Sequence, residues 1–219
     1  MRLTILSLVL VLFVGNATVS AQVVDRPSAF IGANAGALRS NVAGFESFYA
    51  SRVALGYGAF LGIPITNSAF VLFKVDGFTK SNVSITGLSY YIGIPLSSPH
   101  LVTGTVDVTQ WMFNLGVVKV LHIGDQFGIG GDAGLTYLTF AASLSIPAPG
   151  SYAPPPPVPN HRALGVFMGI VGEFRFADSR WALVLEPEYT QLWTIGATHF
   201  ASYGDLLVSG GLRFYFKGH

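Results

Sequence analysis

The feature that most constrains this chain is a regular alternation of two kinds of residue that recurs along almost its whole length. Between Phe127 and Tyr137, every second residue is apolar or small, and those between them are glycines, Asp132 and Thr136. Side chains alternate between the two faces of a β-strand, so this period predicts strands with one apolar face. The same alternation recurs in these segments: 29–38, 49–62, 69–79, 163–176, 181–193 and 205–216.

The composition indicates where such strands would be stable. Hydrophobic residues make up 51% of the chain and charged residues only 11%, less than half of the roughly 25% typical of soluble domains. Beyond the N-terminal segment, no run approaches the roughly 20 apolar residues that a spanning helix needs. In a membrane β-barrel every second residue faces lipid. We therefore predict an all-β fold, a transmembrane up-and-down antiparallel β-barrel.

The N-terminus predicts export. Arg2 precedes an apolar run from Ile5 to Gly15. The segment Val19-Ser20-Ala21 then supplies the small residues that precede a cleavage site before Gln22. This pattern is typical of a secretory signal peptide. We expect residues 1–21 to be cleaved and residues 22–219 to form the barrel domain. The mature part then has 11 bases and 11 acids, which argues against nucleic acid as a partner. The chain has no cysteine, so disulfides and thiolate metal sites are excluded.

Short and long connections are expected to alternate between the strands. Tight turns are predicted at Pro64–Asn67, His122–Asp125 and Ala177–Arg180, and long loops near 40–48, 80–104, 141–162 and 194–204. Short periplasmic turns and long extracellular loops are typical of outer-membrane barrels. With both termini in the periplasm, this pattern predicts eight strands. Val83–Pro95 is also strand-like; we place it in the second loop as a hairpin above the membrane, and ten strands would result if it spans with a partner.

Charged residues fall on the inward rows of the predicted strands. They are Arg52, Lys74, Asp76, Asp132, Glu173, Arg175, Glu186, Glu188 and Arg213. An eight-stranded barrel is only wide enough for side chains to fill it, and buried charges must be paired. We predict a network of ion pairs that plugs the lumen, with a narrow or gated polar conduit as the alternative. Pro187 lacks a donor for the strand ladder and predicts a local bulge or bend.

The last strand carries a recognisable pattern. From Val208 to Phe216, outward hydrophobic residues at every second position end in Phe214 and Phe216. With the glycine-rich inward rows, the mature chain resembles the small Gram-negative outer-membrane β-barrel family (the OmpA-type barrel and its relatives). The resemblance implies an outer-membrane location, contact with its lipids, and Phe214 and Phe216 as the signal read by the barrel-assembly machinery. Trp111, Trp181 and Trp193 are expected to be interfacial aromatics.

Other motifs are weaker as functional signals. Gly128–Ala133 matches a dinucleotide-binding fingerprint, which needs a strand that turns into a helix; here the glycines lie on the inward row of a continuing strand. The histidines have no metal-binding spacing, and we expect no metal and no cofactor. His199, Ser202 and Asp205 are the candidates for a lipid-modifying site. Pro147–Pro159 contains seven prolines, which predicts an extended polyproline segment in an external loop.

Three functions remain open from the sequence. The first is a non-enzymatic barrel with a structural role or a surface that contacts an extracellular partner through its loops. The second is a narrow channel or transporter for small solutes or hydrophobic molecules. The third is an outer-membrane enzyme that modifies lipids, which would require His199, Ser202 and an acid to converge.

Overall fold

The computed structural model describes residues 29–40, 53–88, 101–145, 161–177, 179–194 and 202–216. These ranges contain eight strands. They are β1 (Phe30–Ser40), β2 (Val53–Pro64), β3 (Ala69–Leu88), β4 (Leu101–Ile123), β5 (Phe127–Ser145), β6 (His161–Arg175), β7 (Trp181–Thr194) and β8 (Ser202–Tyr215). The predicted signal peptide and most of the predicted loops lie outside the described residues.

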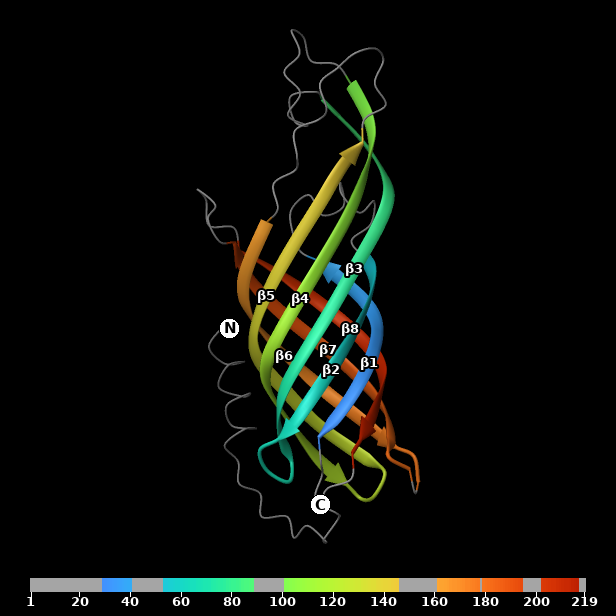
Figure 1. Ribbon diagram of the computed structural model, residues 1–219, viewed down its shortest axis with the longest axis vertical. Coiled ribbons are helices and arrows are strands. Elements are labelled where there is room, and N and C mark those ends of the chain that lie inside the picture. The colour runs from blue at the N-terminus through green and yellow to red at the C-terminus, as the bar shows by residue number, and fades with distance from the viewer. Residues whose placement is uncertain are drawn as a thin grey trace.

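Each strand pairs antiparallel with its neighbours in the chain, and β1 pairs with β8 to close the barrel (Figure 1). The closing pair runs from Phe30 opposite Tyr215 to Ser40 opposite Asp205. The described ranges contain no helix long and apolar enough to cross a membrane. The predicted all-β class and eight-strand barrel are confirmed, and the ten-strand alternative is wrong.

Three strands are longer than the alternation predicted. β3, β4 and β5 rise beyond the other strands at one end of the barrel (Figure 1). Residues 80–88, 101–104 and 141–145, predicted as loops, are strands that remain paired up to Leu88 opposite Leu101. The strand-like Val83–Pro95 is thus explained in its first part as a continuation of β3. The pairing shifts register between Lys80 and Val83, where two residues of β3 face one of β4, as in a β-bulge.

The other end of the barrel carries the short turns. After β2, the amide of Ile65 donates to the carbonyl of Ala69 over 2.8 Å. Between β4 and β5, Gly124 has a φ of 69°, a left-handed conformation that glycine adopts without steric cost. The predicted turn at His122–Asp125 begins later than expected, because His122 still belongs to β4 and pairs with Gly128.

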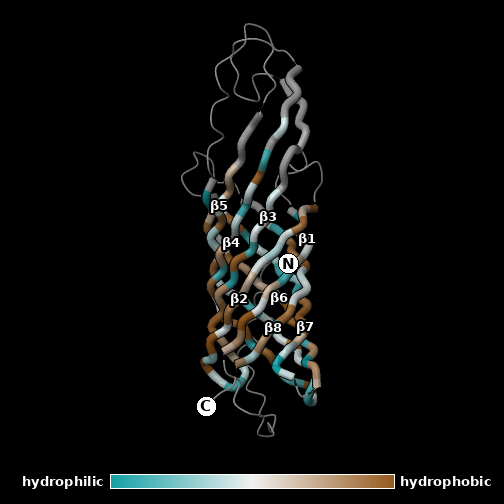
Figure 2. Tube along the Cα trace, turned by 45° about the vertical axis from the view of Figure 1, so that its right-hand side comes forward, coloured by the Kyte–Doolittle hydropathy of each residue, from teal (hydrophilic) through white to brown (hydrophobic). Residues whose placement is uncertain are grey.

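The two faces of each strand differ as the alternation predicted. In β2, Leu55 is 80% exposed, whereas Ala54 and Phe60 on the other face are buried. Hydrophobic and hydrophilic residues follow one another along the strands (Figure 2). Exposed large hydrophobic side chains occur on every described strand, among them Ile31, Leu61, Phe73, Leu115, Leu135, Ile170, Leu185 and Leu212. Such an exterior is costly in water and stable in lipid.

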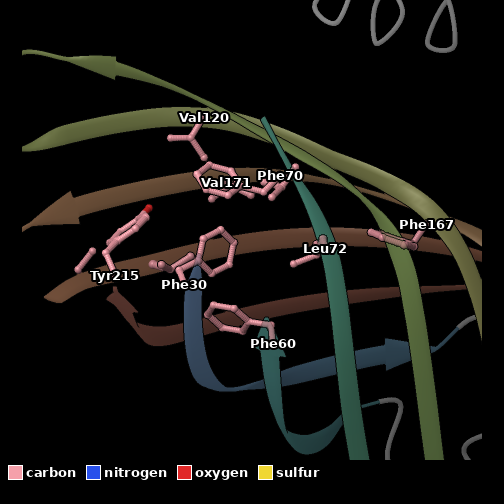
Figure 3. Packing of buried hydrophobic residues seen from close by; sticks show 11 residues of the cluster. Phe30, Phe60, Phe70, Leu72, Val120, Phe167, Val171 and Tyr215 are labelled. Carbon is pink, nitrogen blue, oxygen red and sulfur yellow. The ribbon is translucent and has the colours of Figure 1, made fainter. Parts of the chain in front are cut away.

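The barrel interior is more apolar than its sequence pattern predicted. One cluster, which we call the lower cluster, lies toward the short turns and comprises Phe30, Phe60, Phe70, Leu72, Val118, Val120, Phe167, Val171, Ala182, Val184 and Tyr215. Figure 3 shows Phe30 at its centre, with ring centroids 4.9 Å from Phe70 and 5.7 Å from Tyr215. The upper cluster, toward the long connections, comprises Leu38, Ala54, Phe78, Val108, Met112, Leu138, Ala163, Leu192 and Leu207.

Glycines make room for these large inward side chains. A Cβ on Gly62 would lie 2.1 Å from the Phe30 ring, and one on Gly56 would lie 2.1 Å from the Phe78 ring. Both distances are far below van der Waals contact. The interior therefore combines large aromatic residues with positions that have no side chain, which is how a narrow barrel is filled without overpacking.

The continuation of β3 and β4 predicts a specific cross-link. Thr86 faces Thr103 in the register, and opposed residues in antiparallel strands have Cα atoms roughly 4.5–5.5 Å apart, within disulfide range. Because the chain has no other cysteine, the double variant Thr86→Cys, Thr103→Cys should form an intramolecular disulfide on mild oxidation, seen as a mobility shift on non-reducing gels.

The control for this cross-link is the pair Thr86→Cys, Thr105→Cys. These residues are two positions out of register, because Thr105 faces Ser84, so they should cross-link much more slowly. Equal rates for the two pairs would contradict the extended hairpin.

Candidate functional site

The inward charges lie between the two apolar clusters. On β3, Lys74 and Asp76 stand between Leu72 of the lower cluster and Phe78 of the upper cluster. On β7, the acidic pair at 186 and 188 stands in the same way between Val184 and Leu192. A charged layer is therefore enclosed by apolar side chains on both sides along the barrel axis.

Lys74 is the cation of this layer. Its side chain is 1% exposed and contacts Glu186, and its Nζ lies 2.7 Å from Glu188 Oε2 and 3.9 Å from Asp76 Oδ2. The strands that carry these groups, β3 and β7, are not neighbours in the sheet, so the contacts cross the lumen. A lysine that reaches across a narrow barrel to two carboxylates obstructs it sterically as well as electrostatically.

Neutral polar side chains complete the layer. Asn114 donates to Glu188 Oε1 over 3.5 Å and accepts a hydrogen bond from Thr136, and Thr190 donates to the same glutamate oxygen over 3.3 Å. On the other side, Asn34 donates to Asp76 Oδ1 over 3.3 Å. The predicted network contained charged residues only. These neutral groups also lie on the inward rows of the alternation.

Asp132 enters the same layer from β5. It is 1% exposed, and a ligand oxygen from each of Asp132, Glu186 and Glu188 lies within 4.8 Å of the other two. Among the described residues, no amide, hydroxyl or cationic group donates a hydrogen bond to either carboxylate oxygen of Asp132. Four described acids, with Asp76 as the fourth, therefore gather around one lysine. The inward charges predicted from the sequence are four bases and five acids, which is close to balance. The structure concentrates four of these five acids in this layer.

The remaining inward charges form a second group near the short turns. Glu173 accepts hydrogen bonds from Arg175 Nε, Arg213 Nη1 and Tyr215 OH, each over 2.6 Å. The Arg213 guanidinium also lies 4.2 Å from the centre of the Phe30 ring, a cation–π distance. With two arginines and one glutamate, this group has one surplus positive charge. That charge offsets only part of the layer above, where four acids face one lysine.

The structure thus divides the predicted lumen residues into two groups. Lys74, Asp76, Asp132, Glu186 and Glu188 come together in the middle layer, and Glu173, Arg175 and Arg213 come together near the short turns. Arg52 lies outside the described residues. Tyr215, which donates to Glu173, was not among the predicted lumen residues, although its position on the inward row of the last strand could have identified it.

The register tests one of the two effects predicted for Pro187, a bulge or a bend. The Cα pairing of β6 with β7 is interrupted between Gly169, which faces Glu188, and Gly172, which faces Leu185. The register is the same on both sides of the gap, so no residue is inserted and the bulge is absent. The local bend stays a prediction.

The predicted aromatic and assembly residues lie on the outward face. Trp181 packs against Phe214 with ring centroids 4.9 Å apart, and Phe214 contacts Phe216 at 5.5 Å. Trp111 packs against Tyr57 in the barrel wall at 6.0 Å, and Trp193 is exposed near the end of β7. The anchoring and assembly roles of these residues stay predictions.

The residues of the enzyme hypothesis are largely beyond the described ranges. His199 is not described, the side chain of Ser202 is not described, and Asp205 is buried on the inward face of β8. The fingerprint at Gly128–Ala133 lies inside the continuous strand β5, so it lacks the turn into a helix that a dinucleotide site needs.

The closed antiparallel barrel, its lipid-compatible exterior and its filled interior define the class of protein. The chain is a small eight-stranded antiparallel β-barrel with an exterior suited to lipid, and it has the strand number of the small OmpA-type membrane barrels.

No family model matches the chain, and no curated protein matches it. Solved structures that it resembles include a major outer membrane protein from Thermus thermophilus, with 11% identity, coverage of 86% of this chain and 100% of that one, and a TM-score of 0.49. The outer membrane protein OprG from Pseudomonas aeruginosa has 12% identity, coverage of 89% and 98%, and a TM-score of 0.48. Neisserial surface protein A has 15% identity, coverage of 86% and 97%, and a TM-score of 0.44.

The Lys74 contacts predict a large stability effect. Lys74→Met leaves Glu186 and Glu188 buried without their cation, and breaking a buried ion pair in this way costs about 3–5 kcal/mol. Unfolding in urea, followed by the gel-mobility difference between folded and unfolded barrel, measures the loss.

Lys119→Met is the matched control. Lys119 is half-buried on β4, on the face that carries the exposed Phe113 and Leu115, so its loss should change the stability little, by roughly 0.5 kcal/mol. The triple variant Lys74→Met, Glu186→Gln, Glu188→Gln should recover much of the Lys74→Met loss. A Lys74→Met barrel as stable as Lys119→Met would show that the lumen pair contributes nothing.

Proposed function

We propose that this protein is a non-enzymatic outer-membrane barrel with a closed lumen, whose role is structural or is carried by the surface it presents outside the membrane. The observation that carries this proposal is the filling of the interior. The lower cluster, the charged layer with Lys74, and the upper cluster follow one another along the axis.

Passage through such an interior would be opposed twice. A hydrated ion would first meet apolar side chains, where it would lose hydration without compensation. It would then meet a lysine held by two carboxylates. The interior acids are also enclosed between the apolar clusters, away from any lipid substrate, which supports a non-enzymatic role.

The extension of β3, β4 and β5 supports a role at the cell surface. These strands have 20, 23 and 19 residues, whereas β1 has 11. A membrane-crossing strand needs only about 9–11 residues. The surplus lies at the end opposite the short turns (Figure 1), the end that is extracellular in barrels of this class. A paired, three-stranded extension can present a more rigid surface to an extracellular partner than an unpaired loop.

The barrel wall supports contact with outer-membrane lipids along its length. Aromatic side chains gather on the outer face beside the short turns, where Phe127 packs on Phe174 at 5.1 Å and Trp181 packs on Phe214. Bands of this kind mark the membrane interface in known barrels. We include Trp111 and Trp193 among the anchors, and Phe214 and Phe216 as the residues read by the assembly machinery.

The closed lumen predicts the absence of a stable channel. The protein reconstituted in planar bilayers should show no steady conductance level. The double variant Glu186→Gln, Glu188→Gln should also stay closed, because both apolar clusters remain. A large porin in the same bilayers is the positive control. A steady wild-type conductance that the double variant alters would instead make these glutamates a pore lining and favour the transporter.

The proposed orientation predicts which residues are accessible from outside the cell. In separate single-cysteine variants, Thr105→Cys in the β4 extension should react with a membrane-impermeant maleimide on intact cells. Asn67→Cys in the turn after β2 should react only after the outer membrane is permeabilised. The wild-type chain is the blank, since it has no cysteine. The reverse labelling pattern would contradict the proposed orientation.

A further inference from the structure

Three carboxylates converge in the middle of the barrel lumen without an equal number of cations. Asp132, Glu186 and Glu188 are 1%, 5% and 0% exposed, and one oxygen of each lies within 4.8 Å of the others. Like charges held this close in a low-dielectric interior repel one another strongly. Either a bound cation or a proton shared between two of the carboxyls must therefore relieve this repulsion.

The strand register shows that the convergence is built into the fold. Asp132 on β5 faces Gly169 on β6, and Gly169 faces Glu188 on β7. A Cβ at Gly169 would lie 2.3 Å from Asp132 Oδ1 and 3.2 Å from the carbonyl oxygen of Pro187. The glycine between the two acids thus leaves the space into which the Asp132 carboxylate leans, beside a backbone oxygen.

Asp132 provides the second observation that points to a ligand. Both of its oxygens are buried, and among the described residues no amide, hydroxyl or cationic group donates a hydrogen bond to either of them. One of the two oxygens belongs to the converging set. Leaving an ionised carboxylate buried without a partner is very costly. Lys74 does not supply one, because its ammonium is engaged by Glu186 and Glu188, and the nearby Asp76 adds a fourth acid.

We propose that Asp132, Glu186 and Glu188 bind a calcium ion inside the barrel. Hard divalent cations prefer carboxylate and carbonyl oxygens, and Ca²⁺ binds them at about 2.3–2.6 Å. The three ligand oxygens lie within 4.8 Å of one another, so one Ca²⁺ can contact all of them. Mg²⁺ gives up water reluctantly and usually keeps several water ligands, which a site enclosed between two apolar clusters accommodates poorly. The Pro187 carbonyl and water can complete the coordination.

The site also explains the arrangement of charge along the lumen. A divalent cation and Lys74 together compensate three of the four acidic charges of the layer. Its position between the apolar clusters means that the ion enters as the barrel folds and leaves slowly afterwards. Calcium binding in this place would join β5 to β7 across Gly169, where the ladder between β6 and β7 is interrupted.

The full chain, exported and folded in cells grown with Ca²⁺, then extracted in detergent and freed of loose ions by desalting, tests the proposal. Elemental analysis should find one retained Ca²⁺ per barrel in the wild type and almost none in Asp132→Asn. The exposed turn residue Asp125 gives the matched control Asp125→Asn, which should retain the ion. Gly169→Ala keeps all three carboxylates but displaces Asp132, and should lose most of the bound Ca²⁺.

Thermal unfolding supplies a second readout that does not depend on any variant. The unfolding temperature of the wild-type barrel refolded with Ca²⁺ should exceed that of barrel refolded with a chelator, since a ligand that binds only the folded state stabilises it. Absence of both retained Ca²⁺ and this shift would overturn the proposal. Equal Ca²⁺ retention by wild type and Asp132→Asn would also overturn it, and equal retention of Mg²⁺ would overturn the assignment to calcium.

Discussion

The structure depends first on the need of every backbone N–H and C=O group in a membrane to find a partner within the protein. Lipid offers no hydrogen bonds, so an open sheet edge would leave a row of such groups unsatisfied. Pairing of β1 with β8 removes both edges, from Phe30 opposite Tyr215 onward. Closure then determines the surroundings of both faces of the sheet, because eight strands that join into a barrel have one lipid-facing surface and one narrow interior.

Because the interior is narrow, every inward side chain must fit the space that is left and, if it is charged, must also meet a partner. Large rings such as Phe30 and Phe78 fit only because glycines lie opposite them, and Lys74 is stable only because it reaches carboxylates from another strand. The result is a lumen that is apolar, charged and apolar again. A barrel built in this way is stiff and closed, and its variable parts are the strands and connections beyond the membrane.

Much of this architecture could be predicted because the signal is local. The period of two residues assigns Leu183, Leu185 and Tyr189 to one face of β7 and Glu186 and Glu188 to the other, and the structure has them so. The alternation was less informative at the ends of β3, β4 and β5, where a strand outside the membrane needs no lipid-facing row. There the pairing of β3 with β4, rather than hydrophobicity, continues the strand.

The class of fold and the inward-facing residues could be predicted from the chain alone, because they follow from the local alternation; turn spacing favoured eight strands but left ten open. Which inward residues meet depends on the folded barrel. Asp132 and Glu188 are far apart in the sequence, and their convergence depends on the register of three strands and on Gly169 between them. That register arises when the barrel closes, since the stagger of each strand is then fixed by all the others.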